Sequence, residues 1–363
     1  MKFEILQEEL VKGLSITLRA VASRAQLPVL SNVLIEAKNE AITLIATDLE
    51  VSVSTKVRGK VITPGVATAP AKMLSEFVGS LPSGKVEISL VQESLIITAE
   101  GYKSKLQTIA PEEFPKLTSE IPNKGYEIKV GDLGAATTMV AFASARETLR
   151  PVLTGILFEE VAGGIKLVAT DGFRLSACKI KAQGKGERAS YLIPSRAVSE
   201  AVKIAEGEVI KIVPLSDTQV AFSSGETLLI SQLLDGNFPD YQRIIPKEFE
   251  TQVSVSRDEL MSAIKTVHIF ARGNSNMVRW NVSSAGIAMR SESPERGEAS
   301  ATVAAKVEGE GGEIVFNAKF VLEFLQNTQA KTINFAMGDN LKPGAFREES
   351  NEDYLYIVMP INA

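Results

Sequence analysis

The sequence predicts an α+β protein of three similar domains, each with helices collected on one face of antiparallel sheet. Three observations lead to this prediction. The segment 3–56 aligns with 126–179 without a gap, and a third copy of the same pattern starts at Thr251. Every copy contains two helical patterns separated by runs of strand pattern. Because each copy is much longer than the ~20–50 residues of a solenoid repeat, we interpret the copies as whole domains.

Short blocks of shared sequence mark the copies and set the expected domain boundaries. PVL and ATD recur in the first two copies, at 28–30 and 46–48, then at 151–153 and 169–171. The second halves are marked by APAKMLSEFV, IPSRAVSEAV and FNAKFVLEFL, at 69–78, 193–202 and 316–325. We therefore expect domains at 1–120, 121–247 and 248–363, with short linkers near 118–125 and 246–250.

The elements follow the same order in each copy. A short strand, such as KFEILQ, leads into a helix whose apolar stripe in the first copy is Leu10, Leu14, Leu18 and Val21. Alternating strands follow, and a second helix begins after Pro70, Pro194 or Asn317, which are residue types suited to the first positions of a helix. Further strands close the copy. The expected order is β-α-βββ-β-α-ββββ, so each domain is itself doubled.

Composition is that of a soluble globular protein. The chain has 363 residues, of which 45% are hydrophobic and 23% charged. It opens directly into domain sequence, with no apolar leader and no run long enough to span a bilayer. Cys178 is the single cysteine, which excludes a disulfide framework and favours a buried structural thiol. We expect a cytoplasmic protein. The net charge of −5 argues against indiscriminate binding to polyanions.

Catalytic patterns are nearly absent. His268 is the only histidine, so a Ser-His-Asp triad or a histidine-rich metal site has no strong candidates. The glycine groups at 162–164, 184–187 and 309–312 lack the ending of a phosphate loop and are typical of hairpin turns. Asp48 and Asp171 occupy equivalent positions, where a polar residue that ends a strand and hydrogen-bonds its own turn is favoured over a catalytic acid. We expect the protein to have no catalytic activity and to bind no cofactor or metal.

A basic position recurs at the start of the second helix. Lys72, Arg196 and Lys319 stand there in the three copies, away from the apolar stripe. Other cations on the solvent sides of the helices are Lys12, Arg19, Arg24, Lys203, Lys265 and Arg272. Such a basic stripe would attract phosphates without reading bases. In the first helix of the second copy, Ala135, Phe142 and Glu147 replace three of these cations, which weakens the pattern.

The chain resembles the β subunits of bacterial DNA polymerase III, the sliding clamps. The resemblance covers essentially the whole chain and rests on the triplicated domain and on four strings in order: LPVLSNVLIE, ATDGFRLS at 169–176, DGNFPDYQRIIP at 235–246 and YIVMPI at 356–361. It implies a DNA-clamp fold in which each domain is a pair of β-α-βββ halves. It also implies a head-to-tail homodimer whose six domains form a ring around duplex DNA, with helices lining the hole.

The resemblance also implies site residues. Polymerase III catalytic subunit, clamp loader and other clamp-binding proteins would dock peptides in a pocket formed by Leu153, Thr170, Gly172, Phe173, Arg174, Leu175, Pro239, Arg243, Ile244, Asn317, Ile357, Val358, Met359, Pro360 and Ile361. The residues expected to face DNA are Arg24, Lys72, Arg150, Arg196, Lys203, Arg272 and Lys319. The expected dimer contacts are Leu106 and Ile109 with Ile269 and Phe270. Phe173 departs from the histidine common at its position in relatives.

Two other interpretations stay open at this point. The first is an interaction scaffold, built from repeats, that never encircles DNA. The second is a carboxylate enzyme that uses Asp48 or Asp171, which would require paired acids in a deep cleft. The copies also differ from one another: ATDLEVS in the first lacks the glycine and arginine of ATDGFRL in the second. We therefore expect one peptide pocket in each chain.

Overall fold

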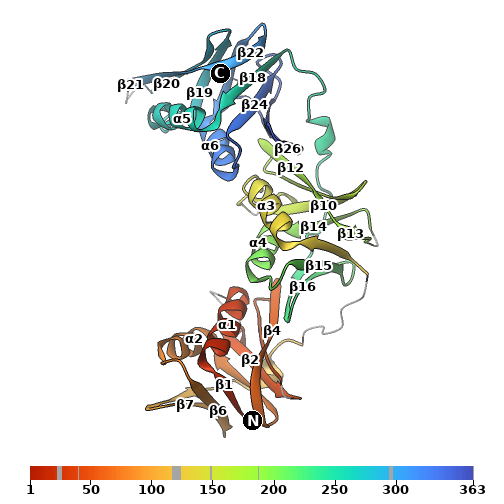
Figure 1. The fold of residues 1–363 in the computed structure, drawn as a ribbon, viewed down its shortest axis with the longest axis vertical. Helices are drawn as coiled ribbons and strands as arrows, with labels where there is room; N and C mark the ends of the chain where they lie inside the picture. Colours follow the sequence, from red (N-terminus) through yellow and green to blue (C-terminus); the bar gives the residue numbers. More distant parts are fainter. Residues whose placement is uncertain are drawn as a thin grey trace. The chain divides into compact units, whose positions relative to one another are not determined.

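The computed structural model describes residues 1–22, 27–39, 41–116, 124–147, 149–186, 188–293 and 297–362. These residues form two compact units (Figure 1). The first unit comprises 1–131, 182–188 and 196–233, and the second comprises 132–181, 189–195 and 234–363. In the described part of the chain, no helix is long and apolar enough to cross a membrane.

The first unit is built on one antiparallel sheet. Its elements in the N-terminal region are β1 (Lys2–Leu6), α1 (Gln7–Thr17), η1 (Leu18–Ala20), η2 (Pro28–Ser31), β2 (Asn32–Lys38), β3 (Ala41–Thr47), β4 (Val51–Thr63), β5 (Gly65–Pro70), α2 (Ala71–Ser80), β6 (Lys85–Val91), β7 (Ser94–Ala99), β8 (Tyr102–Gln107) and η3 (Pro111–Glu113). From the middle of the chain it adds β9 (Tyr126–Lys129), β13 (Gln183–Gly184), all but the first residue of α4 (Ser195–Ile204), β15 (Val209–Pro214), β16 (Gln219–Ser224) and β17 (Thr227–Gln232).

The second unit contains two antiparallel sheets. Its first elements are α3 (Val130–Ala141, from its third residue), η4 (Pro151–Thr154), β10 (Gly155–Val161), β11 (Gly164–Thr170), β12 (Arg174–Lys181), β14 (Ser190–Pro194) and η5 (Tyr241–Arg243). The C-terminal elements are β18 (Thr251–Ser256), α5 (Arg257–Ala271), β19 (Met277–Ser283), β20 (Gly286–Ser293), β21 (Gly297–Val303), β22 (Ala305–Gly309), β23 (Gly312–Asn317), α6 (Ala318–Asn327), β24 (Thr332–Met337), β25 (Gly344–Glu348) and β26 (Asn351–Val358).

Two strand pairings join segments that lie far apart in the sequence. In the first unit β4 pairs with β17, so that Val53 lies opposite Leu229. In the second unit β12 pairs with β26, so that Leu175 lies opposite Ile357. These pairings extend the sheets across the predicted domain boundaries. The division into two compact units therefore cuts through the predicted second domain, and the boundaries at 120 and 247 remain a prediction.

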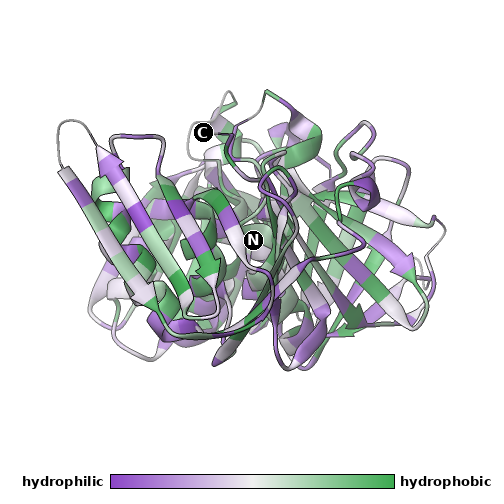
Figure 2. Cartoon of the chain, turned by 90° about the horizontal axis from the view of Figure 1, so that it is seen from above, coloured by the Kyte–Doolittle hydropathy of each residue, from purple (hydrophilic) through white to green (hydrophobic). Residues whose placement is uncertain are grey.

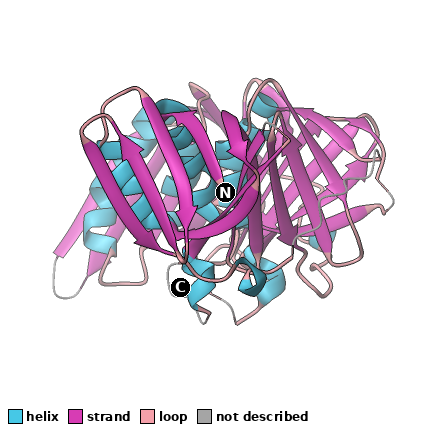
Figure 3. Cartoon of the chain, turned by 90° about the horizontal axis from the view of Figure 1, so that it is seen from below, coloured by secondary structure: helices cyan, strands magenta, loops and turns pink. Residues whose placement is uncertain are grey.

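The helices form where apolar residues recur at helical spacing, and they lie against the strands (Figure 3). The predicted stripe of Val321, Phe324, Leu325 and Thr328 is fully buried; its last member, Thr328, directly follows α6. The Asn317 side chain accepts a hydrogen bond from the backbone N–H of Lys319 over 3.0 Å and so caps this helix. The predicted helix starts after Pro70, Pro194 and Asn317 are confirmed.

The strands alternate between apolar and polar residues (Figure 2). In β26 this alternation is lost, because Tyr354 to Val358 are all buried. Tyr354 and Tyr356 belong to an aromatic core with Phe324, and the rings of Tyr356 and Phe324 stack 5.0 Å apart. The Tyr356 hydroxyl donates to the carbonyl of Phe320, and that of Tyr354 to the carbonyl of Met139. One face of the C-terminal strand is thereby bound to α3 and α6.

The α+β class with antiparallel sheets is confirmed. Two details of the predicted order are wrong in the described residues. Three strands, not four, follow each second helix, and five strands, not four, lie between the two helices in the second and third copies. The predicted strand segment at 85–100 consists of β6 and β7, joined by a tight turn in which Gln92 has a φ of 54°. β8 completes the set. Most of the predicted linker at 118–125 lies outside the described residues.

Candidate functional site

The turn between β11 and β12 is the first part of the candidate peptide site. Gly172 adopts a φ of 94°, in the left-handed region that favours glycine. The Asp171 carboxylate accepts hydrogen bonds from the backbone N–H groups of Phe173 and Arg174, at 2.9 and 3.1 Å. Thr170 donates its hydroxyl to the carbonyl of Arg174 over 2.6 Å. These bonds close a tight turn and leave the Phe173 side chain 65% exposed at its tip.

The C-terminal segment lies directly against this turn. Met359 donates its backbone N–H to the carbonyl of Phe173 over 2.9 Å, continuing the β12–β26 pairing by one residue. Ile361 donates its N–H to the carbonyl of Val315 over 2.8 Å. Met359 is 36% exposed, and Pro360 and Ile361 are half-buried. The structure thus brings the turn and the tail together, as the resemblance implied.

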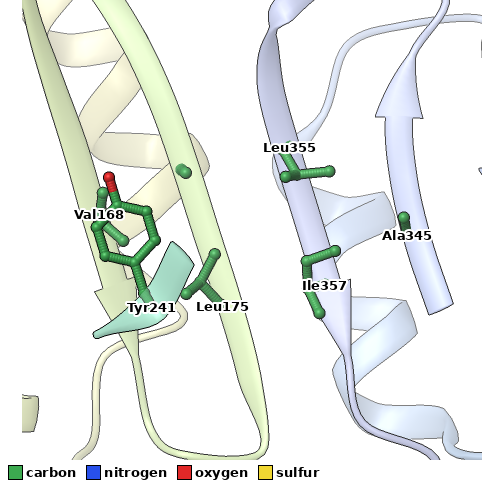
Figure 4. Close-up of a cluster of buried hydrophobic side chains, with 7 residues drawn as sticks. Val168, Leu175, Tyr241, Ala345, Leu355 and Ile357 are labelled. Atoms are coloured by element: carbon green, nitrogen blue, oxygen red, sulfur yellow. The ribbon is translucent and has the colours of Figure 1, made fainter. Parts of the chain in front are cut away.

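An apolar cluster lies on one face of the β11, β12 and β26 strands. Val168, Leu175 and Ile357 are buried in it, together with Tyr241. Figure 4 shows the Tyr241 ring against Val168 and Leu175, with Leu355 and Ile357 on the neighbouring strand. The segment that carries Tyr241 also supplies the predicted pocket residues Pro239, Arg243 and Ile244. Of these, Pro239 and Arg243 are exposed and Ile244 is half-buried.

Tyr241 is a residue of this site that the sequence prediction missed. Its hydroxyl donates a hydrogen bond to the Glu159 carboxylate over 2.6 Å. Burial, and then this carboxylate, raise the pKa of the Tyr241 phenol. The signal was present in DGNFPDYQRIIP, where an aromatic residue stands among turn residues. Its contact with Val168 could not be found without knowing how this segment folds back on the sheet.

Arg174 faces the opposite side of β12 from Leu175, as strand alternation requires. Its side chain is buried, and its guanidinium forms ion pairs with Asp171, at 2.9 Å, and with Glu323 of α6. It also donates to the carbonyl of Phe142 over 2.7 Å and lies 4.6 Å from the centre of the Phe320 ring. The structure therefore places Arg174 beneath the turn, where it joins β12 to α6.

Three other predicted pocket residues also lie away from the exposed part of the site. Leu153 is buried in η4, and Val358 is fully buried in β26. Asn317 is half-buried and caps α6. The surface that remains accessible to a ligand consists of Gly172, Phe173, Pro239, Arg243, Ile244, Met359, Pro360 and Ile361. A mostly apolar surface with a few polar groups suits an extended peptide.

The recurring cations lie at equivalent places. Lys72, Arg196 and Lys319 are each the second residue of α2, α4 and α6, and all are exposed. Arg196 differs from the other two, because its guanidinium forms a 2.8 Å ion pair with Asp48. Lys203 is paired with Glu200 at 2.9 Å. Within the described residues, Lys72, Lys319, Arg150 and Arg272 have no carboxylate within ion-pair distance, and Arg24 lies outside those residues.

Asp48 hydrogen-bonds its own turn, as predicted. Its carboxylate accepts from the N–H groups of Glu50 and Val51, at 3.1 and 2.8 Å. Asp48 and Asp171 are thus both bound to a turn and to an arginine, Arg196 or Arg174. The turn and the arginine supply partners for the carboxylate oxygens of each aspartate, so no second acid is needed to explain these residues.

The predicted dimer contacts lie on two elements. Leu106 is buried in β8, and Ile109 follows it half-buried, with its N–H bonded to the Thr68 hydroxyl over 2.9 Å. Ile269 is 53% exposed on α5, beside the half-buried Phe270. In the described part of the chain β8 pairs with β7 alone and β21 with β20 alone, so each is the edge strand of its sheet.

Comparisons with known proteins give one consistent result. Models of the N-terminal, central and C-terminal domains of the DNA polymerase III beta subunit match residues 1–118, 127–240 and 242–362. The beta sliding clamp of Bacillus subtilis is 30% identical over 376 residues, which cover 99% of each chain. A crystal structure of the DNA polymerase III subunit beta from Pseudomonas aeruginosa is 30% identical and superposes with a TM-score of 0.95, covering 100% of both chains. A structure of the sliding clamp from that organism bound to griselimycin gives a TM-score of 0.94 at 29% identity, again over 100% of both chains.

Proposed function

Because the chain belongs to the DNA polymerase III beta subunit family, we propose that it is a DNA sliding clamp that encircles duplex DNA as a head-to-tail homodimer. The observation that carries this proposal is the match of three family domains, in order, over nearly the whole chain. The three-domain α+β fold agrees with it. The clamp would tether polymerases to DNA as a processivity factor, without catalysis of its own, in the cytoplasm where the chromosome is replicated.

Ring closure is supported by the two edge strands. β17 and β26 are the last strands of the second and third domains, and each pairs with the long strand, β4 or β12, of the preceding domain. The equivalent strands left without such a pairing are β8 of the first domain and β21 of the third. Antiparallel addition of β8 to β21 of a second copy would satisfy both edges. Exposed Lys103 and Lys105 on β8 are opposite in charge to exposed Glu298 on β21.

Contact between the hydrophobic residues predicted for the dimer fits the same arrangement. Ile269 is an exposed apolar residue on α5 and Met73 is another on α2, at 53% and 57% exposure. Burial of such exposed apolar side chains by a partner would stabilise the complex. With Leu106, Ile109 and Phe270 they would form the apolar part of an interface whose edges are charged.

Binding to DNA would depend on phosphates rather than on base edges. The exposed lysines Lys72 and Lys319 occupy equivalent helix positions and have no partner carboxylate in the described residues. Such contacts are weak, salt-sensitive and independent of sequence, which permits sliding. Retention on DNA would then come from the closed ring, and a clamp loader would be needed to open it.

Peptide docking would take place on the surface formed by the 170–174 turn, the 239–244 segment and the C-terminal tail. Its exposed apolar residues, Phe173 and Met359, stand at the rim of the cluster that contains Leu175 and Ile357. The clients would be the polymerase III catalytic subunit, the clamp loader and other clamp-binding proteins, each through a short extended segment.

The test is retention on DNA of two topologies. The protein is loaded by its clamp loader onto nicked circular duplex, and the bound fraction is separated by gel filtration. We expect the protein to stay with the circle and to be lost once the circle is cut to a linear form. Equal retention on circular and linear DNA would refute encirclement, and no retention on either would favour an interaction scaffold that does not bind DNA.

A further inference from the structure

A glutamate recurs at one helix position in all three domains, and an arginine follows the first helix of each domain. The second helix of each domain carries a glutamate four residues after its recurring cation: Glu76 in α2, Glu200 in α4 and Glu323 in α6. Each first helix is followed, within five residues of its end, by an arginine: Arg19, Arg146 and Arg272 after α1, α3 and α5. These arginines do not align in the repeat, since Phe142 occupies the place of Arg19 in the second copy, so the three share only the region just after the helix.

Two of these arginines bind the glutamate of the next domain along the chain. In the first unit, the Arg19 guanidinium lies 2.8 Å from the Glu200 carboxylate. In the second unit, the Arg146 guanidinium lies 3.7 Å from the Glu323 carboxylate. Both glutamates are largely covered, with side-chain exposures of 16%. An arginine at the end of the first helix of one domain thus meets a glutamate on the second helix of the following domain.

Each of these glutamates also binds a second cation. Glu200 accepts from Lys203 over 2.9 Å, and Glu323 accepts from the buried Arg174. A carboxylate that is largely covered by its neighbours and bound by two cations is a fixed part of a junction. A glutamate of this kind is more than a solvated surface charge.

The third arginine and the third glutamate have no such partner. Arg272 and Glu76 are both exposed, and within the described residues neither lies within ion-pair distance of an opposite charge. Of the domains matched at 1–118, 127–240 and 242–362, the third contains Arg272 and the first contains Glu76. Among these three domains, none follows that of Arg272 to supply a glutamate, and none precedes that of Glu76 to supply an arginine.

We propose that Arg272 forms an ion pair with Glu76 of the partner subunit, as the third junction of the same kind. The proposal rests on the head-to-tail assembly proposed above and identifies which helix residues close it. It also reassigns Arg272 from contact with DNA to contact between subunits. In this pair the third domain supplies the basic residue and the first domain the acidic one. On the edge strands the charges are arranged the other way, with the first domain basic and the third acidic. A shifted pairing of the strands would bring like charges together, so the pair also opposes such a shift.

The test is a charge-reversal experiment on the dimerisation constant of the full chain, measured by analytical ultracentrifugation over a dilution series. Arg272→Glu and Glu76→Arg each place like charges at both junctions of a dimer. We expect each to raise the dimer Kd about tenfold or more. Lys185→Glu and Glu310→Arg are controls, because they make the same charge changes at exposed loop positions.

An equimolar mixture of the two variants is the decisive measurement. In a mixed dimer every junction again joins an acid to a base, so we expect a Kd within about twofold of the unaltered protein. Recovery in the mixture also excludes misfolding as the cause of the single effects. If the variants dimerise as the controls do, or if mixing gives no recovery, the Arg272–Glu76 pair is refuted while the ring stands. A wild-type chain that is monomeric throughout would refute the proposed homodimer itself.

Discussion

The Tyr241 hydroxyl donates a 2.6 Å hydrogen bond to the carboxylate of Glu159, and its ring covers Val168 and Leu175. This contact anchors the segment that precedes the third domain to the β10–β12 strands of the second. The exposed residues Pro239 and Arg243 lie on either side of it. One side of the candidate peptide site is therefore positioned by a residue that is itself buried.

Tyr241→Phe should reduce the free energy of unfolding by about 1–2 kcal/mol, because a hydrogen bond to a charged group is lost from a partly buried site. Urea denaturation followed by circular dichroism would measure the change. Tyr102→Phe is the matched control, since Tyr102 is 50% exposed and should change stability very little. Equal stability of Tyr241→Phe and the unaltered protein would contradict the structural role of this hydroxyl.

Met359→Ala should weaken peptide binding about tenfold, because a side chain of this size contributes about 1.5 kcal/mol when a ligand buries it. The backbone bond from Met359 to Phe173 is kept in this variant, so the tail should stay in place and stability should change little. Calorimetry with a synthetic peptide from the clamp-binding region of the polymerase catalytic subunit would measure the affinity. Leu341→Ala, at a residue 66% exposed in the same unit, is the control and should leave affinity unchanged.

The repeated helices could be predicted because their apolar residues recur at helical spacing, and the predicted stripe of α6 is wholly buried. The direction of single side chains in the candidate site was harder to predict. Arg174 and Val358 were assigned to the pocket with their neighbours Leu175 and Ile357, which belong to the apolar cluster. Both face the opposite side of their strands from those neighbours, because strand alternation turns adjacent residues to opposite faces. Tyr241 was missed, since its role depends on a contact with Glu159 more than seventy residues earlier in the chain.

Ion pairs between distant segments could not be predicted from the sequence either. Arg196 was grouped with Lys72 and Lys319 by its position, and the grouping holds for the helix register. Its ion pair with Asp48 depends on how α4 packs beside the turn after β3. Periodicity shows which face of a helix is polar, but it does not show which opposite charge that face meets.

The Cys178 thiol should be unreactive in the folded protein. Burial, followed by the carboxylates of Glu348 and Asp353, raises its pKa to about 12. At about pH 8 the thiolate fraction should be about a thousandfold lower than for a free cysteine. A chromogenic disulfide reagent should react with one thiol in guanidinium chloride and with none in buffer within the same time. Rapid reaction of the native protein would contradict the burial of this side chain.

Lys72→Ala and Lys319→Ala should each reduce the salt dependence of DNA binding. If each lysine contacts one phosphate, the slope of log K against log salt should fall by about 0.9 for each. Fluorescence anisotropy of a short labelled duplex at several salt concentrations would give the slopes. Stability should be unchanged, because neither lysine has an ion-pair partner among the described residues.

Arg196→Ala provides the contrast to those two variants. Its guanidinium is bound to Asp48, so its removal should cost about 0.2–1 kcal/mol of unfolding free energy. We expect a smaller change in the salt slope than for either lysine, since an arginine held by a carboxylate releases fewer counterions when DNA binds. A full reduction of about 0.9 with no loss of stability would show that the Asp48 pair does not persist in solution.

Glu200→Gln should make the free energy of unfolding less dependent on pH in the acid range. Burial raises the pKa of this carboxyl, but hydrogen bonds from Lys203 and Arg19 lower it and prevail, so its folded-state pKa lies below the ordinary 4.5. A group with a lowered pKa contributes stability above its unfolded pKa and loses that contribution as the pH falls through the folded pKa. The unaltered protein should therefore be the more stable of the two at about pH 7, and the difference should shrink steadily below about pH 4.5. Urea midpoints across this range would measure the difference, with Glu93→Gln, at an exposed position, as the control.

A difference that is constant across the range would mean that the charge on Glu200 does not stabilise the contact between η1 and α4.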